Sequence, residues 1–273
     1  MGGGLRDYWL KAGKEVVATT VRSDQDKNPI IQLDLAQAAH CWPEIPHCHA
    51  AVLCAAMTSL EECRSNPAAT HFVNVTQTLT LAHRLVEQGS FVVFLSTNLV
   101  FDGSRPLRRS TEIPSPITEY GRQKAEAEAG FAQFGERAAI VRLTKVFHSA
   151  MPLMRSWIDE LRAGRAIAPF ADLVCAPISF ATATRTIAAI AERLLPGIWQ
   201  LSAAADISYA HIAERLAQNG GYDPLLVRFS SAPPAMTLES RPRHTTLDAT
   251  RAESELGFEV PNPLTVVDQT IFP

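Results

Sequence analysis

Short runs of apolar residues alternate with stretches of helical periodicity through the first half of the chain. A run that is apolar or β-branched throughout predicts a strand buried on both faces, and apolar residues three and four positions apart predict an amphipathic helix. Glycine or proline stands where several of these helices should begin or end, as at Gly13, Pro67 and Gly89. The predicted strands cover residues 15–21, 30–33, 50–55, 91–95 and 138–143, and the predicted helices cover residues 5–12, 66–88 and 120–134.

This alternation of strand and helix predicts an α/β fold, a doubly wound parallel sheet with helices on both faces. Right-handed crossovers bring the carboxyl ends of the strands to one edge of such a sheet, where open α/β sheets bind ligands. Beyond residue 150 the pattern loosens into helices near residues 153–163 and 181–195, with short strands and proline-rich joints. We therefore predict a core domain over residues 1–150 and a smaller C-terminal substrate lobe over residues 151–273, interleaved with the core.

Composition narrows the class of protein. The chain has 273 residues and a net charge of −3, so it lacks the broad basic field of a dedicated nucleic-acid binder. Its longest unbroken apolar stretch, residues 50–57, is far shorter than the ~20 residues that cross a bilayer. No secretory signal opens the sequence, and the odd number of cysteines, five, favours reduced thiols. We expect a soluble cytoplasmic protein that binds neither nucleic acid nor membrane.

Three residues near one predicted sheet edge form a candidate catalytic group. Thr97 follows strand 91–95, and Tyr120 and Lys124 stand four residues apart on one face of the next helix. A nearby ammonium favours the phenolate and should lower the tyrosine pKa from ~10 toward the range of a general acid. The three groups could protonate a carbonyl oxygen while a nicotinamide delivers hydride. The Tyr-x-x-x-Lys spacing alone is common on solvated helix faces. The order of strand 91–95, residues 96–103 and residues 120–124 along the chain therefore carries more weight than the Tyr120–Lys124 pair.

The order of these motifs resembles that of the extended short-chain dehydrogenase/reductases, and within them the dTDP-4-dehydrorhamnose reductase family of sugar-nucleotide reductases. The likeness extends over nearly the whole chain. The family-like pieces are residues 33–35, 54–58, Asn74, residues 96–103, Glu112, residues 120–124, Arg142, Pro177, and residues 197–202, 241–243 and 247–248. The resemblance implies a Rossmann-type fold and an NAD(P)H-dependent reduction of a 4-keto group on a nucleotide-linked deoxysugar.

The resemblance also implies a role for each matching residue. Thr97 would bind and polarise the keto oxygen, Tyr120 would donate the proton, and Lys124 would tune Tyr120 and hold the nicotinamide ribose. Cofactor contacts are implied for four residues that follow the second and third predicted strands, namely Asp34, Leu35, Ala55 and Ala56. The candidate substrate contacts are Thr58, Asn98 and Lys145, of which the last departs from the family.

The N-terminus departs from the family. A dinucleotide-binding fold opens with an apolar strand and a G-x-x-G-x-x-G turn, whereas this sequence begins with Met1 and three glycines. Gly3, Gly4 and Leu5 align as the remnant of a phosphate-binding loop, and the first strand is missing. Its loss would leave strands 15–21 and 50–55 with unpaired edges or make them pair directly. Two explanations stay open: a natural start upstream of Met1, or a genuine loss of the strand that weakens cofactor binding.

Three further positions bear on the ligands. Arg22 follows strand 15–21, where an acidic residue would favour NAD and an arginine suits a 2′-phosphate, so we predict NADP with NAD as the alternative. Asn98 stands where many relatives carry aspartate. Lys145 stands where an aromatic residue is expected, so it could contact a diphosphate or an acidic sugar, or point outward. The histidines and cysteines of residues 40–49 match no zinc-site spacing, and we predict no metal.

Two rival functions are weighed against the reductase. One is a non-catalytic binding or regulatory subunit, as in relatives that partner a methionine adenosyltransferase, which the missing strand favours and the three catalytic residues oppose. The other is an epimerase of the same fold, which would need tightly held NAD. For the reductase itself, we expect a nucleotide-sugar substrate and consider a homodimer, because relatives pair through helices.

Overall fold

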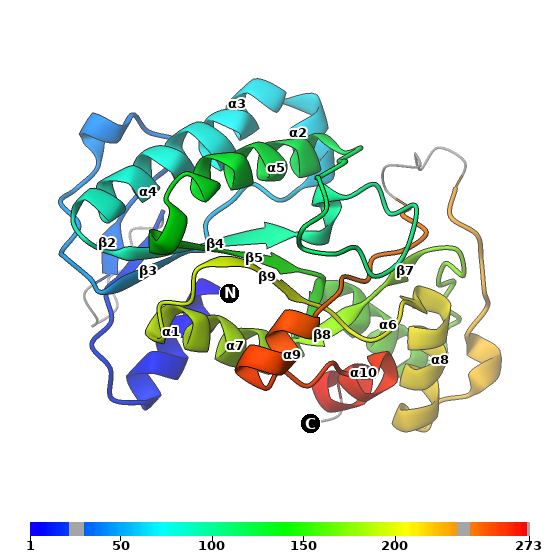
Figure 1. Cartoon of the computed structure of the whole chain (residues 1–273). Coiled ribbons are helices and arrows are strands. Elements are labelled where there is room, and N and C mark those ends of the chain that lie inside the picture. The colour runs from blue at the N-terminus through cyan, green and yellow to red at the C-terminus, as the bar shows by residue number, and fades with distance from the viewer. Residues whose placement is uncertain (22–29, 234–240, 272–273) are drawn as a thin grey trace. The chain divides into compact units, whose positions relative to one another are not determined.

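The computed structural model describes residues 1–21, 30–233 and 241–271. The chain divides into two compact units, each built from segments that are separate in sequence. Unit 1 contains residues 1–100, 116–142 and 184–199, and unit 2 contains residues 101–115, 143–183 and 200–273. Both units combine helices and strands, as Figure 1 shows.

The main sheet has four strands in the order β3-β4-β5-β9. These are β3 (Ala50–Leu53), β4 (Phe91–Thr97), β5 (Ala138–Leu143) and β9 (Gly197–Leu201). Strands β3 and β4 run parallel, with Ala50 opposite Phe91. The residues of β4 from Phe91 to Phe94 are all buried, because helices cover both faces of the sheet at this strand. The α/β fold with a parallel sheet is thus confirmed.

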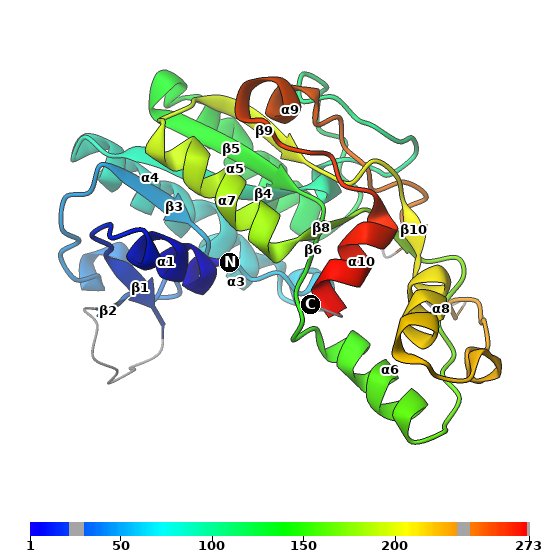
Figure 2. The same ribbon diagram turned by 90° about the horizontal axis from the view of Figure 1, so that it is seen from below.

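Helices cover both faces of this sheet, as Figures 1 and 2 show from two directions. On one face lie α2 (Leu60–Ser65), α3 (Pro67–His71), the π-helical segment η2 (Phe72–Gln77), α4 (Thr78–Glu87) and α5 (Glu119–Ala132). On the other lie α1 (Gly2–Lys11) and α7 (Phe180–Glu192). The core between α5 and the sheet includes Phe131, whose ring stacks on that of Phe94 with 4.4 Å between the centroids. Trp9 of α1 donates a hydrogen bond to Glu192 of α7 at 2.8 Å, which ties the two helices of the second face together.

The N-terminal strands form a separate sheet. Strands β1 (Ala18–Thr20) and β2 (Ile30–Gln32) pair in parallel with each other, and β3 ends the four-stranded sheet. Of the two predicted outcomes, direct pairing of residues 18–20 with residues 50–53 is therefore wrong. In the described ranges β1 pairs with β2 alone, and β3 pairs with β4 alone. Three residues of each N-terminal run form a strand in this sheet.

Unit 2 has its own core. It contains two small sheets, in which β6 (Lys145–Phe147) pairs in parallel with β8 (Pro177–Ser179), and β7 (Val174–Cys175) pairs antiparallel with β10 (Ile207–Ser208). Its helices are α6 (Pro152–Arg162), α8 (Tyr209–Gly220), α9 (Thr250–Leu256) and α10 (Pro263–Ile271). Trp157, Ile212, Leu216 and Val267 form the centre of the core. In the described part of the chain, no helix is both long and apolar enough to pass through a bilayer.

Candidate active site

Gly121 in the first turn of α5 allows this turn to contact the segment that follows β4. Thr118 caps α5 by accepting a hydrogen bond from the Gly121 amide at 2.9 Å. A Cβ atom at position 121 would overlap the carbonyl oxygen of Leu99, which belongs to the turn after β4. The absence of a side chain at Gly121 therefore lets the first turn of α5 press against the segment that follows Thr97. The two predicted sources of catalytic groups, the end of β4 and the start of α5, are in contact.

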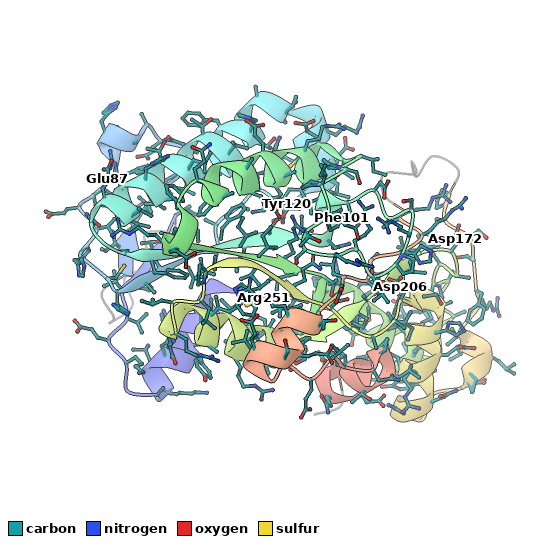
Figure 3. The ribbon with its side chains drawn as sticks, in the orientation of Figure 1. Glu87, Phe101, Tyr120, Asp172, Asp206 and Arg251 are labelled. Carbon is teal, nitrogen blue, oxygen red and sulfur yellow. The ribbon has the colours of Figure 1, made fainter. Side chains whose placement is uncertain are left out.

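Thr97 and Tyr120 lie in these two segments. The Thr97 hydroxyl accepts a hydrogen bond from the Leu99 amide at 3.2 Å and lies 3.5 Å from the side-chain oxygen of Asn98. Tyr120 is nearly buried, with 9% of its surface exposed, and projects from the start of α5 on the side toward β4 (Figure 3). Asn98 opens the short 3₁₀ helix η3 (Asn98–Val100) that α5 contacts. The structure thus brings the Thr97 segment and the Tyr120 helix turn together.

Lys124 is buried one turn further along α5. Its ammonium lies 3.8 Å from the centre of the Phe94 ring, a cation–π contact between α5 and β4. Burial lowers the pKa of Lys124 to about 7, although the charge of Glu128 and the Cys54 thiol act in the opposite direction. Burial also raises the pKa of Tyr120 to about 12, with a smaller contribution from Cys63. The expectation that Lys124 lowers the tyrosine pKa is therefore wrong here, because desolvation dominates.

A buried ion pair supports this part of α5. Glu128 and Arg142 are both at least 95% buried, and two Arg142 nitrogens donate to the two carboxylate oxygens at 3.0 and 2.7 Å. Ser96 of β4 donates to the same carboxylate at 2.5 Å. Sequence reasoning gave no role to Glu128, although its place one turn after Lys124 and the arginine inside an apolar strand were available signals. The pair fixes α5 to β4 and β5.

The start of α1 presents free backbone amides. Gly2, Gly3 and Gly4 form the first helical turn rather than a loop, which corrects the expected phosphate-loop remnant. No side chain caps this helix, and the first amide bonded within it is that of Leu5, which donates to the Met1 carbonyl. A Cβ atom on Gly2 would lie 3.6 Å from that of Cys54, so the helix begins beside the end of β3. Uncapped amides at a helix N-terminus fit the pyrophosphate of a dinucleotide.

The remaining predicted cofactor residues lie after the strands, but they differ in exposure. Ala55 is exposed and Ala56 half-buried in the segment that follows β3. Asp34 is half-buried and accepts a hydrogen bond from the Ala36 amide at 2.8 Å. Leu35 is buried in the core of unit 1, so its side chain is not accessible to a cofactor. Arg22, the residue on which the choice of NADP rests, lies outside the described residues.

The predicted substrate residues are divided between the two units. Thr58 is exposed in unit 1, and Asn98 is half-buried there. Lys145 is the first residue of β6 in unit 2 and is exposed. As for metals, no three histidine, cysteine, aspartate or glutamate side chains gather into a possible ligand set anywhere in the described ranges.

Comparisons with known proteins show the family of the chain and its fold. The model of the RmlD substrate binding domain family matches residues 1–271. The "Probable low-salt glycan biosynthesis reductase Agl14" of Haloferax volcanii is 27% identical over 76% of this chain and 72% of its own length. The methionine adenosyltransferase 2 subunit beta of Xenopus tropicalis is 30% identical, but over only 41% of this chain and 34% of its own length. A crystal structure of dTDP-4-dehydrorhamnose reductase from Bacillus anthracis in complex with NADP superposes with a TM-score of 0.73 at 20% identity, over 81% of this chain and 79% of that one, which shows a shared fold.

Proposed function

Because the chain belongs to the RmlD substrate binding domain family, we propose that it is an NADPH-dependent reductase of a 4-keto group on a nucleotide-linked deoxysugar. The observation that carries the proposal is the contact between the β4 end and the α5 start, which combines a hydroxyl, a phenol and a buried lysine. The named relatives support the reaction class, since one is a glycan biosynthesis reductase and another reduces dTDP-4-dehydrorhamnose. The substrate we propose is accordingly a dTDP-4-keto-6-deoxyhexose.

The cofactor would be held mainly by backbone. The amides of Gly2, Gly3 and Gly4 would bind the pyrophosphate, and no side chain blocks Gly3, around which nothing lies within 4 Å of a Cβ position. The turn at Asp34 would meet the adenosine, and the exposed Ala55 would line the dinucleotide cleft. When bound, NADPH supplies the hydride that reduces the keto carbon, and NAD in place of NADP is the alternative tested below.

The protein's own groups would handle the substrate oxygen. Thr97 donates a hydrogen bond that polarises the C4 carbonyl, and the Tyr120 hydroxyl gives its proton to the oxygen as the carbon is reduced. The raised pKa of Tyr120, about 12, keeps the phenol protonated at neutral pH, which is the form that a general acid requires. Lys124, when protonated, stabilises the phenolate that results and holds the nicotinamide ribose. Thr58, Asn98 and Lys145 are proposed to contact the nucleotide sugar.

The experiment that tests the proposal has two stages. Calorimetric titration with NADPH and with NADH measures cofactor binding and choice, and loss of NADPH absorbance with dTDP-4-dehydrorhamnose measures reduction. We expect NADPH to bind more tightly than NADH and the sugar to be consumed in equal amount with NADPH. Binding of neither dinucleotide, or binding without turnover of any dTDP-4-keto sugar, would overturn the proposal.

The similarity to a methionine adenosyltransferase subunit favours a second candidate, a non-catalytic regulatory subunit. It would show stable association with a methionine adenosyltransferase in sedimentation velocity, together with no turnover of keto sugars. Sedimentation velocity of the chain alone tests a further proposal, a homodimer. Calorimetric titration of proteolytic fragments with NADPH tests another, the functional division into a cofactor core (1–150) and a substrate lobe (151–273). A cytoplasmic site fits the five cysteines, all of which are free thiols.

A further inference from the structure

We propose that Gln123 and Asn74 form a two-amide clamp that positions the catalytic helix α5 against the cofactor-side segment after β3. The role of the clamp in catalysis rests on the proposed function. The clamp itself is a set of contacts within unit 1. Neither residue is proposed to touch substrate or cofactor. Both are positioning residues that act through Tyr120 and Lys124 on one side and Met57 on the other.

The first half of the clamp is on α5. Gln123 stands between Tyr120 and Lys124 and is 1% exposed. Its amide oxygen accepts a hydrogen bond from the Asn74 side chain at 2.8 Å, and its amide nitrogen lies 2.9 Å from the Thr70 hydroxyl, to which it donates. Residue 123 is rotated by about 100° from residue 124 on a helix, so its side chain leaves α5 on a different side from the ammonium. Gln123 therefore holds the helix from its flank and leaves the reacting face open.

The second half of the clamp reaches the segment after β3. The Asn74 oxygen accepts from the Met57 amide at 2.8 Å, and its nitrogen donates to the Met57 carbonyl at 2.9 Å. One side chain thus bonds both backbone groups of one residue, which fixes the orientation of that backbone as well as its position. Met57 directly follows Ala55 and Ala56, the residues proposed to line the cofactor cleft.

The local backbone explains how Asn74 reaches both partners. It lies in the π-helical segment η2, in which Asn74 and Gln77 are buried. A π-helical turn holds an extra residue, so side chains within it leave the helix in directions that a regular α-helix does not offer. Such turns are frequent at functional sites. The η2 segment therefore aims a buried amide at Met57 and at Gln123 together.

The chemistry of the clamp calls for amides at both positions. Gln123 accepts from Asn74 and donates to Thr70, and an ionised carboxylate cannot donate. Asn74 likewise accepts from and donates to Met57. The Gln123–Asn74 and Gln123–Thr70 hydrogen bonds are buried, so the loss of one partner there leaves a buried polar group without a hydrogen bond. A substitution of either amide should therefore weaken the hydrogen bonds of the other.

The test compares Gln123→Met, which keeps the length of the side chain but removes its hydrogen bonds, with Gln123→Glu, which keeps the acceptor and loses the donor. The matched control is Glu126→Gln, an exposed site on the same helix whose side chain makes a surface pair with His71 of α3. Three quantities are measured: amide hydrogen exchange at Met57, thermal midpoint, and kcat and KM with NADPH and the keto sugar. Asn74→Ala removes the acceptor of the Met57 amide, so it gives the exchange rate of that amide without this hydrogen bond.

For Gln123→Met we expect exchange at Met57 to rise about tenfold and kcat to fall about 10- to 100-fold, with KM for the sugar within about twofold of wild type. Gln123→Glu should be affected at least as strongly, because it buries a carboxylate beside that of Glu119, and the control should match wild type. A lower thermal midpoint with unchanged Met57 exchange and unchanged kcat would overturn the proposal, because it would show a purely structural role. If the wild type reduces no keto sugar, the proposed function fails, and the exchange at Met57 still decides whether the clamp exists.

Discussion

Helices α1 and α5 both begin beside strand ends of unit 1, but their first turns are built in opposite ways. The first turn of α5 is closed: Thr118 caps it, Gly121 lies against Leu99, and Gln123 is fixed by buried amides. The first turn of α1 is open, because three glycines leave its amides without a side-chain cap. A first turn that is capped and packed holds its side chains in fixed positions. A first turn without a cap leaves its backbone amides available to bind an anion.

The difference separates two tasks of the proposed enzyme. The α5 turn carries the groups that move a proton, whose positions must be held to a fraction of an ångström. The α1 turn offers a diffuse positive end, which tolerates small shifts of an anionic ligand. Changes in α5 should therefore affect turnover, and changes in α1 should affect binding. Of four predictions, in order of decreasing expected effect, three test this separation and one tests the burial of Lys124 in α5.

Removal of the Tyr120 hydroxyl should have the largest effect. We expect Tyr120→Phe to lower kcat by about 10²- to 10⁴-fold, the contribution typical of a general acid, with NADPH affinity within about twofold of wild type. Steady-state kinetics and calorimetry measure the two quantities. Ordinary turnover by the folded variant would exclude Tyr120 as the acid.

The buried charge of Lys124 predicts a pH-dependent stability. Its pKa falls from 10.5 to about 7 on folding, so the unfolded chain binds more protons between pH 7 and about 10. Stability should therefore rise with pH through this window, and the cost of burying the charge is fully present below pH 7. Denaturant titrations of wild type and Lys124→Met at pH 6.5, 8 and 9.5 (chosen to span about the whole window) compare the two slopes. Their difference should be positive and confined to this range, and equal slopes would show that Lys124 stays charged in the folded protein.

The close contact at Gly121 predicts an effect of a single methyl group. Gly121→Ala should shift the start of α5 from the Leu99 carbonyl, with a loss of about 1–3 kcal/mol in stability and at least about a tenfold fall in kcat. Gly3→Ala is the matched control for stability and for kcat at saturating NADPH, since nothing lies near the added Cβ atom. Similar kinetics for both alanine variants would mean that the α5 turn is not tightly positioned.

The open turn of α1 predicts a binding effect without a catalytic one. Gly3→Glu places a negative charge among the free amides, where it should weaken NADPH binding about tenfold by repelling the pyrophosphate. The same charge is favourable for the helix itself by about 0.3–1 kcal/mol, so the thermal midpoint should not fall. Calorimetry and kcat at saturating NADPH separate the two effects. An unchanged affinity would place the pyrophosphate elsewhere.

The sequence predicted the elements of the sheet centre well. The expected helix 120–134 and strands 91–95 and 138–143 differ from α5, β4 and β5 by two residues or fewer at each end. A long apolar run can be buried on both faces only as a strand inside the sheet. Its pattern in the sequence therefore predicts where the strand begins and ends. The strand predicted at 15–21 shortens to β1 (Ala18–Thr20), because the pattern of a run does not show whether a neighbour is present to pair with it.

Two features of the site could not be predicted from residue spacing. The periodicity of residues 66–88 fits one helix, but Thr78 donates from its side chain to the Val73 carbonyl five residues earlier, within the π-helical interruption. The Tyr120–Lys124 spacing predicts a lowered tyrosine pKa, yet the pKa is raised, because burial depends on the packing around α5 rather than on the pair. The roles of Thr97, Tyr120 and Lys124 stay predictions until turnover is measured.

The most direct test of the central claim follows the hydride and the proton in one reaction. The protein is incubated with dTDP-4-dehydrorhamnose and NADPH that carries deuterium on the transferred position of the nicotinamide, and the product is examined by mass spectrometry and NMR. We expect one deuterium at sugar C4 with the wild-type chain, and labelled product that forms about 10²- to 10⁴-fold more slowly with Tyr120→Phe. Cofactor binding without deuterium at C4, or labelling by Tyr120→Phe at an equal rate, would contradict the proposed reaction.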